Sequence, residues 1–208
     1  MANNGTPSKR EGQMKEQLLK AALKLFTQKG YAATSVREIV ATAGVSKPML
    51  YYYFENKEGI YRALMQRLFG QLELLFQDYH AKTSSIKEQL LSLFDRGFSL
   101  VSDNRDLIRL MHAIYYGPPQ GAPFFDFDAY HTKFQGFIRQ IVEKGVKTGE
   151  FRSGKASDMA WALMGAAQIA TEEQILNREP QIDRKKLQRI LSVIFQGVEA
   201  ESQKEGKR

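Results

Sequence analysis

The segment 35–54 restricts the fold of this chain more than any other part of the sequence. Ser35 and Glu38 have the spacing of a capping box, which satisfies free amides at the start of a helix. Gly44 stands where a residue in the left-handed conformation can end that helix at little steric cost. Pro48 falls in the first turn of a second helix, where a missing N–H does no harm. The pattern predicts two short helices joined by a tight turn, the helix-turn-helix unit that reads DNA.

Helical geometry predicts which side chains of the second helix face outward. Leu50 and Phe54 are one turn apart and are expected to point into the core. Tyr51 and Tyr52 then lie toward solvent, with Tyr53 on a flank of the helix. On a groove-facing helix, tyrosine hydroxyls can meet phosphates and the rings can touch thymine methyl groups. A helical hairpin that binds another protein through these tyrosines is the alternative. The residues predicted at base edges are Lys47, Pro48, Met49 and Tyr52, and those predicted on or near phosphates are Ser35, Arg37, Tyr51, Tyr53 and Lys57.

Residues 14–64 resemble the DNA-binding domain of the TetR (tetracycline-repressor) family of transcriptional regulators. The family pattern runs through this segment without a gap, and the remaining residues carry no diagnostic motif. The resemblance implies a dimer in which an effector, bound in a larger C-terminal domain, displaces the fourth helix and releases the DNA. The residues that carry it are Ala21-Ala22-x-x-Leu25-Phe26, Gly30-Tyr31-x-x-Thr34-Ser35-Val36-x-x-Ile39-Val40, Ala43-Gly44-Val45-Ser46-Lys47-Pro48-x-Leu50-Tyr51-Tyr52-Tyr53-Phe54 and Asn56-Lys57-Glu58.

The distribution of charge agrees with a nucleic-acid partner. Residues 1–62 contain ten Lys or Arg and five Asp or Glu, so they carry +5 of the chain's net charge of +7. A positive excess on one domain favours contact with phosphates. The chain has no cysteine, and its three histidines fall at no metal-ligand spacing. Because no catalytic motif or phosphate-binding loop occurs either, we expect no enzyme activity, no metal and no cofactor.

Hydrophobic periodicity predicts helices nearly everywhere, and the fold is expected to be all-α. No apolar run reaches the roughly 18 to 20 residues that span a bilayer, and the N-terminus lacks the apolar core of a signal peptide. We therefore expect a cytoplasmic protein with no membrane partner. The expected domains are a flexible basic arm over 1–13, a three-helix DNA-binding domain with the helix-turn-helix over 14–62, and a larger helical bundle for effector binding and dimerisation over 63–208, within which residues 117–123 are the clearest break.

Aromatic residues are concentrated in the middle of the chain, where eight of the 23 lie between residues 109 and 137. A cavity lined by aromatic rings with a few polar groups is the usual form of a small-molecule site. Aromatic side chains at helical spacing also commonly fill a packed core, so both interpretations stay open. The candidate effector-binding residues are Phe69, Leu72, Phe94, Phe98, Met111, His112, Tyr115, Tyr130, Phe134, Trp161 and Gln168.

The last two predicted helices favour a homodimer. One carries small residues on a face that would admit a neighbouring helix, and the other is more apolar than a single buried stripe requires. The alternative is that both helices only complete the core of one chain. In the family that the chain resembles, the two corresponding helices pair with their symmetry mates. The candidate interface residues are Met159, Leu163, Ala166, Ala170, Leu187, Ile190, Leu191, Ile194, Phe195 and Val198.

Together these patterns predict a dimeric one-component transcriptional repressor. Two recognition helices related by a two-fold axis require a palindromic operator. A small-molecule effector of unknown identity would release the protein from that operator. Two alternatives remain, namely a DNA-binding protein without an effector and a helical adaptor that binds other proteins.

Overall fold

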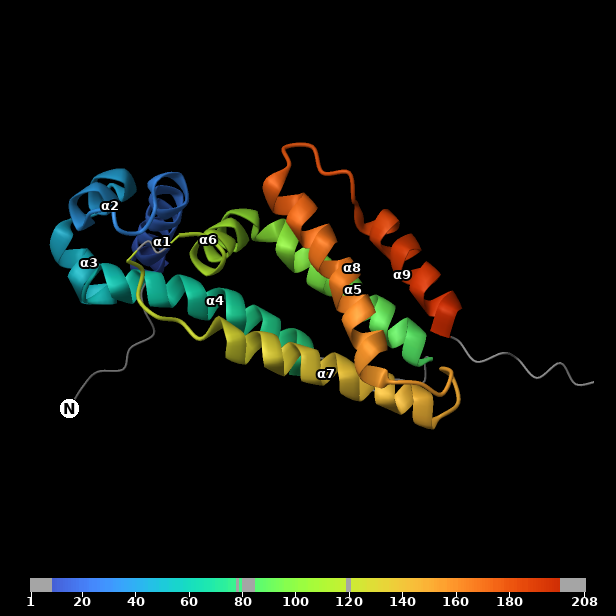
Figure 1. Cartoon of the computed structure of the whole chain (residues 1–208). Coiled ribbons are helices and arrows are strands. Elements are labelled where there is room, and N and C mark those ends of the chain that lie inside the picture. Colours follow the sequence, from blue (N-terminus) through green and yellow to red (C-terminus); the bar gives the residue numbers. More distant parts are fainter. Residues whose placement is uncertain (1–8, 78, 80–84, 119–120, 199–208) are drawn as a thin grey trace, which may run out of the picture. The chain divides into compact units, whose positions relative to one another are not determined.

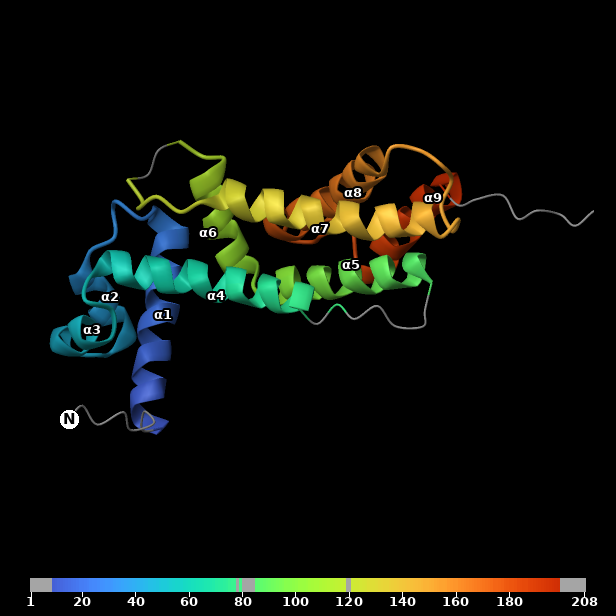
Figure 2. The ribbon, with the colours of Figure 1, turned by 90° about the horizontal axis from the view of Figure 1, so that it is seen from below.

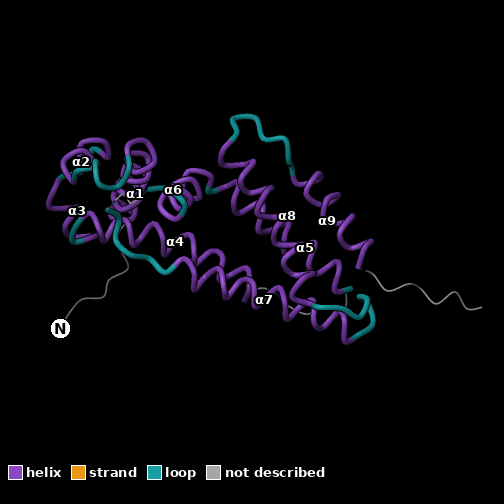
Figure 3. Tube along the Cα trace, in the orientation of Figure 1, coloured by secondary structure: helices purple, strands orange, loops and turns teal. Residues whose placement is uncertain are grey.

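The computed structural model describes residues 9–77, 79, 85–118 and 121–198, except for the side chains of residues 9 and 198. Within these residues the chain forms α-helices joined by loops, with no β-strand (Figure 3), which confirms the predicted all-α fold. The helices are α1 (Lys9–Lys29), α2 (Val36–Ala43), α3 (Lys47–Phe54), α4 (Lys57–Gln77), α5 (Ile86–Asp103), α6 (Arg105–Tyr115), α7 (Phe127–Lys147), α8 (Ala156–Leu176) and α9 (Arg184–Val198).

The helices group into two compact units. Unit 1 comprises residues 1–70 and 104–125, and unit 2 comprises residues 71–103 and 126–208. α4 is one continuous helix whose residues through Gly70 belong to unit 1 and whose last turns belong to unit 2. The described part of unit 1 thus contains α1, α2, α3, most of α4 and α6 (Figure 1).

The start and end of α2 follow the signals read from the sequence. The Ser35 hydroxyl accepts a hydrogen bond from the Glu38 amide, and the Glu38 carboxylate accepts one from the Ser35 amide, which completes the predicted capping box. Gly44 ends the helix at a φ of 63°, a conformation that L side chains rarely adopt. Its amide and that of Val45 donate to carbonyls of the last turn. The turn between α2 and α3 is therefore fixed by local interactions.

α6 packs against α1 in unit 1, an arrangement that the sequence did not indicate. The Thr27 hydroxyl of α1 donates to the backbone carbonyl of Asp106 in α6 at 3.4 Å. Residues 104–125 are therefore grouped with the helix-turn-helix rather than with the rest of the C-terminal segment. The domain boundary predicted after residue 62 stays a prediction. α1 begins at Lys9, within the residues 1–13 that were predicted as a flexible arm, and residues 1–8 lie outside the described residues.

Unit 2 is built from α5, α7, α8 and α9, with the last turns of α4 (Figure 2). α5 contacts the other three helices, and α8 contacts both α7 and α9. The core consists of apolar side chains from all four, including Leu90, Phe94, Ile138, Leu163 and Phe195. Burial of this apolar surface is the main source of stability for the unit. Among the described helices, none is both long and apolar enough to cross a bilayer.

Candidate nucleic-acid interface

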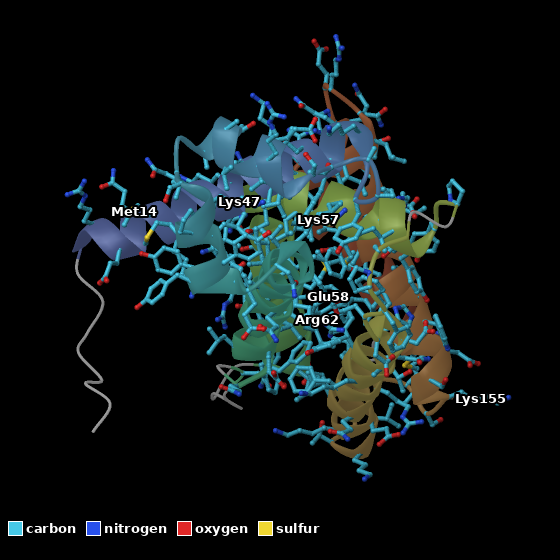
Figure 4. All side chains as sticks on the ribbon, turned by 90° about the vertical axis from the view of Figure 1, so that its left-hand side faces the viewer. Met14, Lys47, Lys57, Glu58, Arg62 and Lys155 are labelled. Atoms are coloured by element: carbon cyan, nitrogen blue, oxygen red, sulfur yellow. The ribbon has the colours of Figure 1, made fainter. Side chains whose placement is uncertain are left out.

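α3 has one buried face and one exposed face. Leu50 and Phe54 are buried in unit 1, whereas Tyr52 exposes 71% of its surface and Tyr51 exposes 44%. Lys47 is also exposed (Figure 4). This is the orientation expected from the i,i+4 spacing of Leu50 and Phe54. A helix with this face of rings, hydroxyls and an ammonium group is suited to the major groove of DNA.

The first turn of α3 carries the remaining side chains predicted at base edges. The Lys47 ammonium lies 5.7 Å from the centre of the Tyr51 ring, within the range of a cation–π contact. Pro48 is exposed and Met49 is half-buried. The Lys47 ammonium is exposed beside the Tyr51 ring and therefore remains accessible to a base edge or a phosphate.

Tyr53 differs from its two neighbours. Its ring contacts those of Tyr52 and Phe54, with centroids 5.1 and 6.3 Å away. Its hydroxyl is buried and makes no hydrogen bond within the described residues. Burial and, secondarily, the Glu11 carboxylate raise the pKa of the Tyr53 hydroxyl. This placement gives no support to the predicted phosphate contact of Tyr53, and orients its ring toward the protein instead.

The start of α2 presents the next group of predicted contacts. Ser35 and Arg37 are both exposed there. A hydrogen bond from Lys29 and two from Ser35 lower the pKa of the Glu38 carboxyl to about 2. Glu38 is thus ionised at neutral pH and fixes the cap. The first amides of α2 and the Arg37 guanidinium are suited to a phosphate, since helix N-termini attract anions.

Lys57 is the last of the residues predicted on phosphates, and its ammonium makes hydrogen bonds within the protein. Its ammonium donates to the backbone carbonyls of Tyr31 and Thr34, both at 2.9 Å. It also lies 4.1 Å from the centre of the Tyr31 ring. The side chain is half-buried, and burial lowers the pKa of its ammonium. Its position was not anticipated from the sequence, because its partners are more than twenty residues away.

The candidate effector residues are divided between the two units. Phe69, Met111, His112 and Tyr115 belong to unit 1. Phe69 is buried and stacks on Phe125 with ring centroids 5.0 Å apart. His112 contacts the ring of Tyr116 at 4.7 Å. Tyr115 contacts the same Tyr116 ring, with centroids 4.6 Å apart.

The other candidates lie in unit 2. Phe94 and Phe98 are buried in its core, and Phe134 packs against that core. Phe134 also stacks on Phe76 of α4, with centroids 5.6 Å apart. These contacts match the alternative of a packed aromatic core at these positions. Of the rest, Leu72 and Tyr130 are half-buried, while Trp161 and Gln168 are exposed.

The candidate dimer residues separate into buried and accessible groups. Five of them are already covered inside one chain, where they form part of the unit 2 core, namely Leu163, Ala170, Leu187, Leu191 and Phe195. This differs from their predicted role, because a side chain without accessible surface has none left to contribute to a partner. Met159, Ala166, Ile190 and Ile194 are half-buried, and the side chain of Val198 lies outside the described residues.

The candidate dimer residues did not include several exposed apolar side chains of these helices. Ile169 and Leu176 of α8 and Val193 of α9 are exposed by 56, 65 and 68%. Together with Trp161 and Gly165, the exposed residues of α8 recur at helical spacing on one face. The available signal was that α8 is apolar nearly all round, which indicates a helix covered on more than one side.

In the described part of the chain, no group of three or more His, Cys, Asp or Glu side chains is arranged so that it could hold a metal ion.

Comparison with known proteins identifies the class of this fold. Residues 18–64 match the family model described as bacterial regulatory proteins, tetR family. The chain is 32% identical over 141 residues to the probable HTH-type transcriptional regulator YttP of Bacillus subtilis, a match that covers 66% of this chain and 67% of the relative. It is 27% identical over 155 residues to the HTH-type transcriptional repressor KstR2 of Rhodococcus jostii, covering 71 and 72% of the two chains.

A solved structure supports the same fold over most of the chain. The SmeT–triclosan complex has a TM-score of 0.72 at 16% identity and covers 91% of this chain and 93% of that one. SmeT is the repressor of the Stenotrophomonas maltophilia multidrug efflux pump SmeDEF. The fold and these relatives define a DNA-binding transcriptional regulator with a helix-turn-helix, which is not an enzyme. The chain belongs to the TetR family.

Proposed function

We propose that this protein is a dimeric one-component repressor that inserts α3 into the major groove of a palindromic operator. The observation that carries the proposal is the exposed face of α3, where Lys47, Tyr51 and Tyr52 project away from the buried Leu50 and Phe54. Base edges would be read by Lys47, Pro48, Met49 and Tyr52. Ser35, Arg37 and Tyr51 would contact phosphates and set the register on the duplex.

Repression is favoured over activation by the relatives. KstR2 of two organisms is described as a repressor. A repressor of this kind needs only to occupy its operator, so the same groove contacts account for regulation. Because several phosphates would be neutralised, operator affinity should fall steeply as salt rises.

The exposed apolar face of α8 and α9 supports the dimer. Trp161, Ile169, Leu176 and Val193 are large apolar side chains on the two helices, and all are more than half exposed. Apolar surface of this kind commonly marks an interface between proteins. A second copy of the same face would cover it, and the resulting two-fold dimer would carry two copies of α3.

The proposed effector is a small organic molecule bound by the unit 2 segment of the chain. Of the candidate residues there, Leu72 and Tyr130 are half-buried and Trp161 and Gln168 are exposed, so these four keep surface that a ligand could contact. The SmeT structure was solved with triclosan, an aromatic compound. α4 continues without a break from unit 1 into unit 2. Because it is one helix, a displacement of its last turns would also move its first turn. A coupling free energy of about 1–3 kcal/mol would suffice for a switch.

Operator binding can be tested with a duplex selected from a random pool and measured by fluorescence anisotropy. Tyr52→Ala and Lys47→Ala should each weaken binding about tenfold or more, as expected for the loss of a base contact. Tyr116→Ala and Lys185→Ala are matched controls, because they remove an exposed tyrosine and an exposed lysine elsewhere. Equal affinity of all four variants would refute the assignment of α3. Absence of any salt-dependent binding would favour the protein-interaction adaptor.

The dimer is tested by the mass of the protein in solution. Ile169→Asp should convert dimers to monomers in light scattering, because a buried, unpaired carboxylate at an apolar interface is costly. Gln140→Asp adds the same charge at an exposed position of α7 and should leave the mass unchanged. A dimer that survives Ile169→Asp and Val193→Asp together would contradict the use of this face.

A further inference from the structure

Lys57 connects α4 to the turn that precedes α2. It is the first residue of α4, and its ammonium donates to the carbonyls of Tyr31 and Thr34. Its charge also lies over the ring of the buried Tyr31, which contacts the rings of Phe26 in α1 and Tyr61 in α4. One side chain therefore holds three groups of a turn that is distant from it in sequence.

The peptide between Thr34 and Ser35 is held at both edges. Its carbonyl accepts from Lys57, and its N–H donates to the Glu38 carboxylate at 2.9 Å. Ser35 is the N-cap of α2, so this peptide sets the direction in which the helix begins. The Thr34 side chain is buried and its hydroxyl donates to the Gly30 carbonyl at 2.9 Å. The start of α2, proposed above as a phosphate site, is thereby fixed on the side of α4.

The geometry leaves little of Lys57 for DNA. An ammonium has three N–H donors. Two of them are used by carbonyls at 2.9 Å, and the ring of Tyr31 covers a further side at 4.1 Å. A phosphate could gain at most one hydrogen bond unless the contacts with the turn were broken. Those contacts replace the water lost when the side chain became half-buried, so breaking them is costly.

We propose that Lys57 is a positioning residue for DNA binding: it holds the N-terminus of α2 in place from the start of α4 and does not itself neutralise a phosphate. The inference rests on the proposed operator binding. It replaces the predicted phosphate contact of Lys57 with an internal one.

The dependence of affinity on salt separates the two roles. Lys57→Met removes the charge and the donors but keeps the length of the side chain. Operator affinity should fall about tenfold, while the slope of log affinity against log salt should stay at the wild-type value. A lost phosphate contact instead lowers that slope by about 0.9 for each copy, or about 1.8 for a dimer. Arg37→Met, which removes a proposed phosphate contact, calibrates the size of such a change. If the salt slope of Lys57→Met is reduced as much as that of Arg37→Met, the proposal is overturned.

Lys57→Arg provides a second variant that keeps the positive charge. A phosphate accepts arginine readily, so a phosphate contact would preserve the affinity. The planar guanidinium does not reproduce the position of the ammonium against two carbonyls and a ring. Positioning therefore predicts weakened binding with an unchanged salt slope. Full affinity of Lys57→Arg together with a reduced slope in Lys57→Met would refute positioning.

Amide hydrogen exchange tests the inference without DNA. In Lys57→Met the amides of Ser35 and Glu38 should exchange at least several-fold faster, because the peptide before α2 has lost one of its anchors. The amides of Ile86 and Lys87, in unit 2, should be unaffected. If the wild-type protein binds no duplex, the proposed function fails. Hydrogen exchange then still decides whether Lys57 holds the start of α2. Unchanged exchange at Ser35 and Glu38 would overturn it.

Discussion

Glu150 completes the hydrogen bonding of the first amides of α5. The Ser85 amide donates to the Glu88 carboxylate at 3.2 Å, and the Glu88 amide donates to the Ser85 hydroxyl at 3.1 Å. The two amides between them, of Ile86 and Lys87, donate to the two Glu150 carboxylate oxygens, both at 2.8 Å. A helix start leaves such amides without partners in its own backbone. The negative charge also complements the helix dipole.

Glu150→Gln is expected to destabilise unit 2. The glutamine keeps one carbonyl acceptor, but places an NH₂ group where the second oxygen accepted from a backbone N–H. The loss of one charge-assisted hydrogen bond and of the dipole interaction amounts to about 2–3 kcal/mol. For a chain of this size, that loss lowers Tm by about 4–12 °C.

Scanning calorimetry of the full chain measures this shift, with Glu179→Gln as the control. Glu179 is exposed between α8 and α9, so the same chemical change there should alter Tm by less than about 1 °C. A decrease of under about 2 °C for Glu150→Gln, or one equal to that of the control, would refute the assignment of Glu150 as the cap of α5.

Three further outcomes follow from the structure. Gly145→Ala should lower the free energy of unfolding by about 1–3 kcal/mol, because a Cβ would lie 2.4 Å from the Phe151 ring; a neutral effect in urea unfolding would contradict this packing. Tyr61→Phe should leave stability unchanged or raise it by up to about 1 kcal/mol, because the Tyr61 hydroxyl is buried without a hydrogen bond in the described residues. A clear loss in the same assay would show that this hydroxyl has a partner. The pKa of Glu38 is lowered from 4.5 to about 2, so its stabilising effect is present above pH 4.5 and is lost as pH falls toward 2. The wild type should therefore be more stable than Glu38→Gln at pH 6, and this difference in the free energy of unfolding should shrink as pH falls from about 4.5 toward 2. A difference that stays constant from pH 6 to 2 would contradict this role of Glu38.

The sequence predicted best what depends on neighbouring residues. The capping box of Ser35 and the left-handed Gly44 lie within a few residues of their partners, so α2 and α3 were placed from local chemistry. The orientation of α3 followed from the spacing of Leu50 and Phe54. These features identify the face proposed to read DNA.

Long-range contacts could not be predicted in the same way. Glu150 caps α5 from 64 residues away, and nothing near either segment indicates the pairing. The contact of α6 with α1 joins segments of different predicted domains. In α8 the apolar residues surround the helix, so periodicity could not tell the face in the core from the face left exposed. Leu163 is buried for this reason while Ile169 is not.

The burial of Leu191 and Phe195 within one chain has a consequence for assembly. Because the inner side of α9 is already covered without a second copy, the proposed dimer would not need a partner to bury that side. Pairing would then be a separate, reversible equilibrium that uses only outward side chains such as Val193. At low expression levels the protein would persist as intact single subunits, and occupancy of a two-fold symmetric site would rise more steeply than in proportion to the amount of protein made.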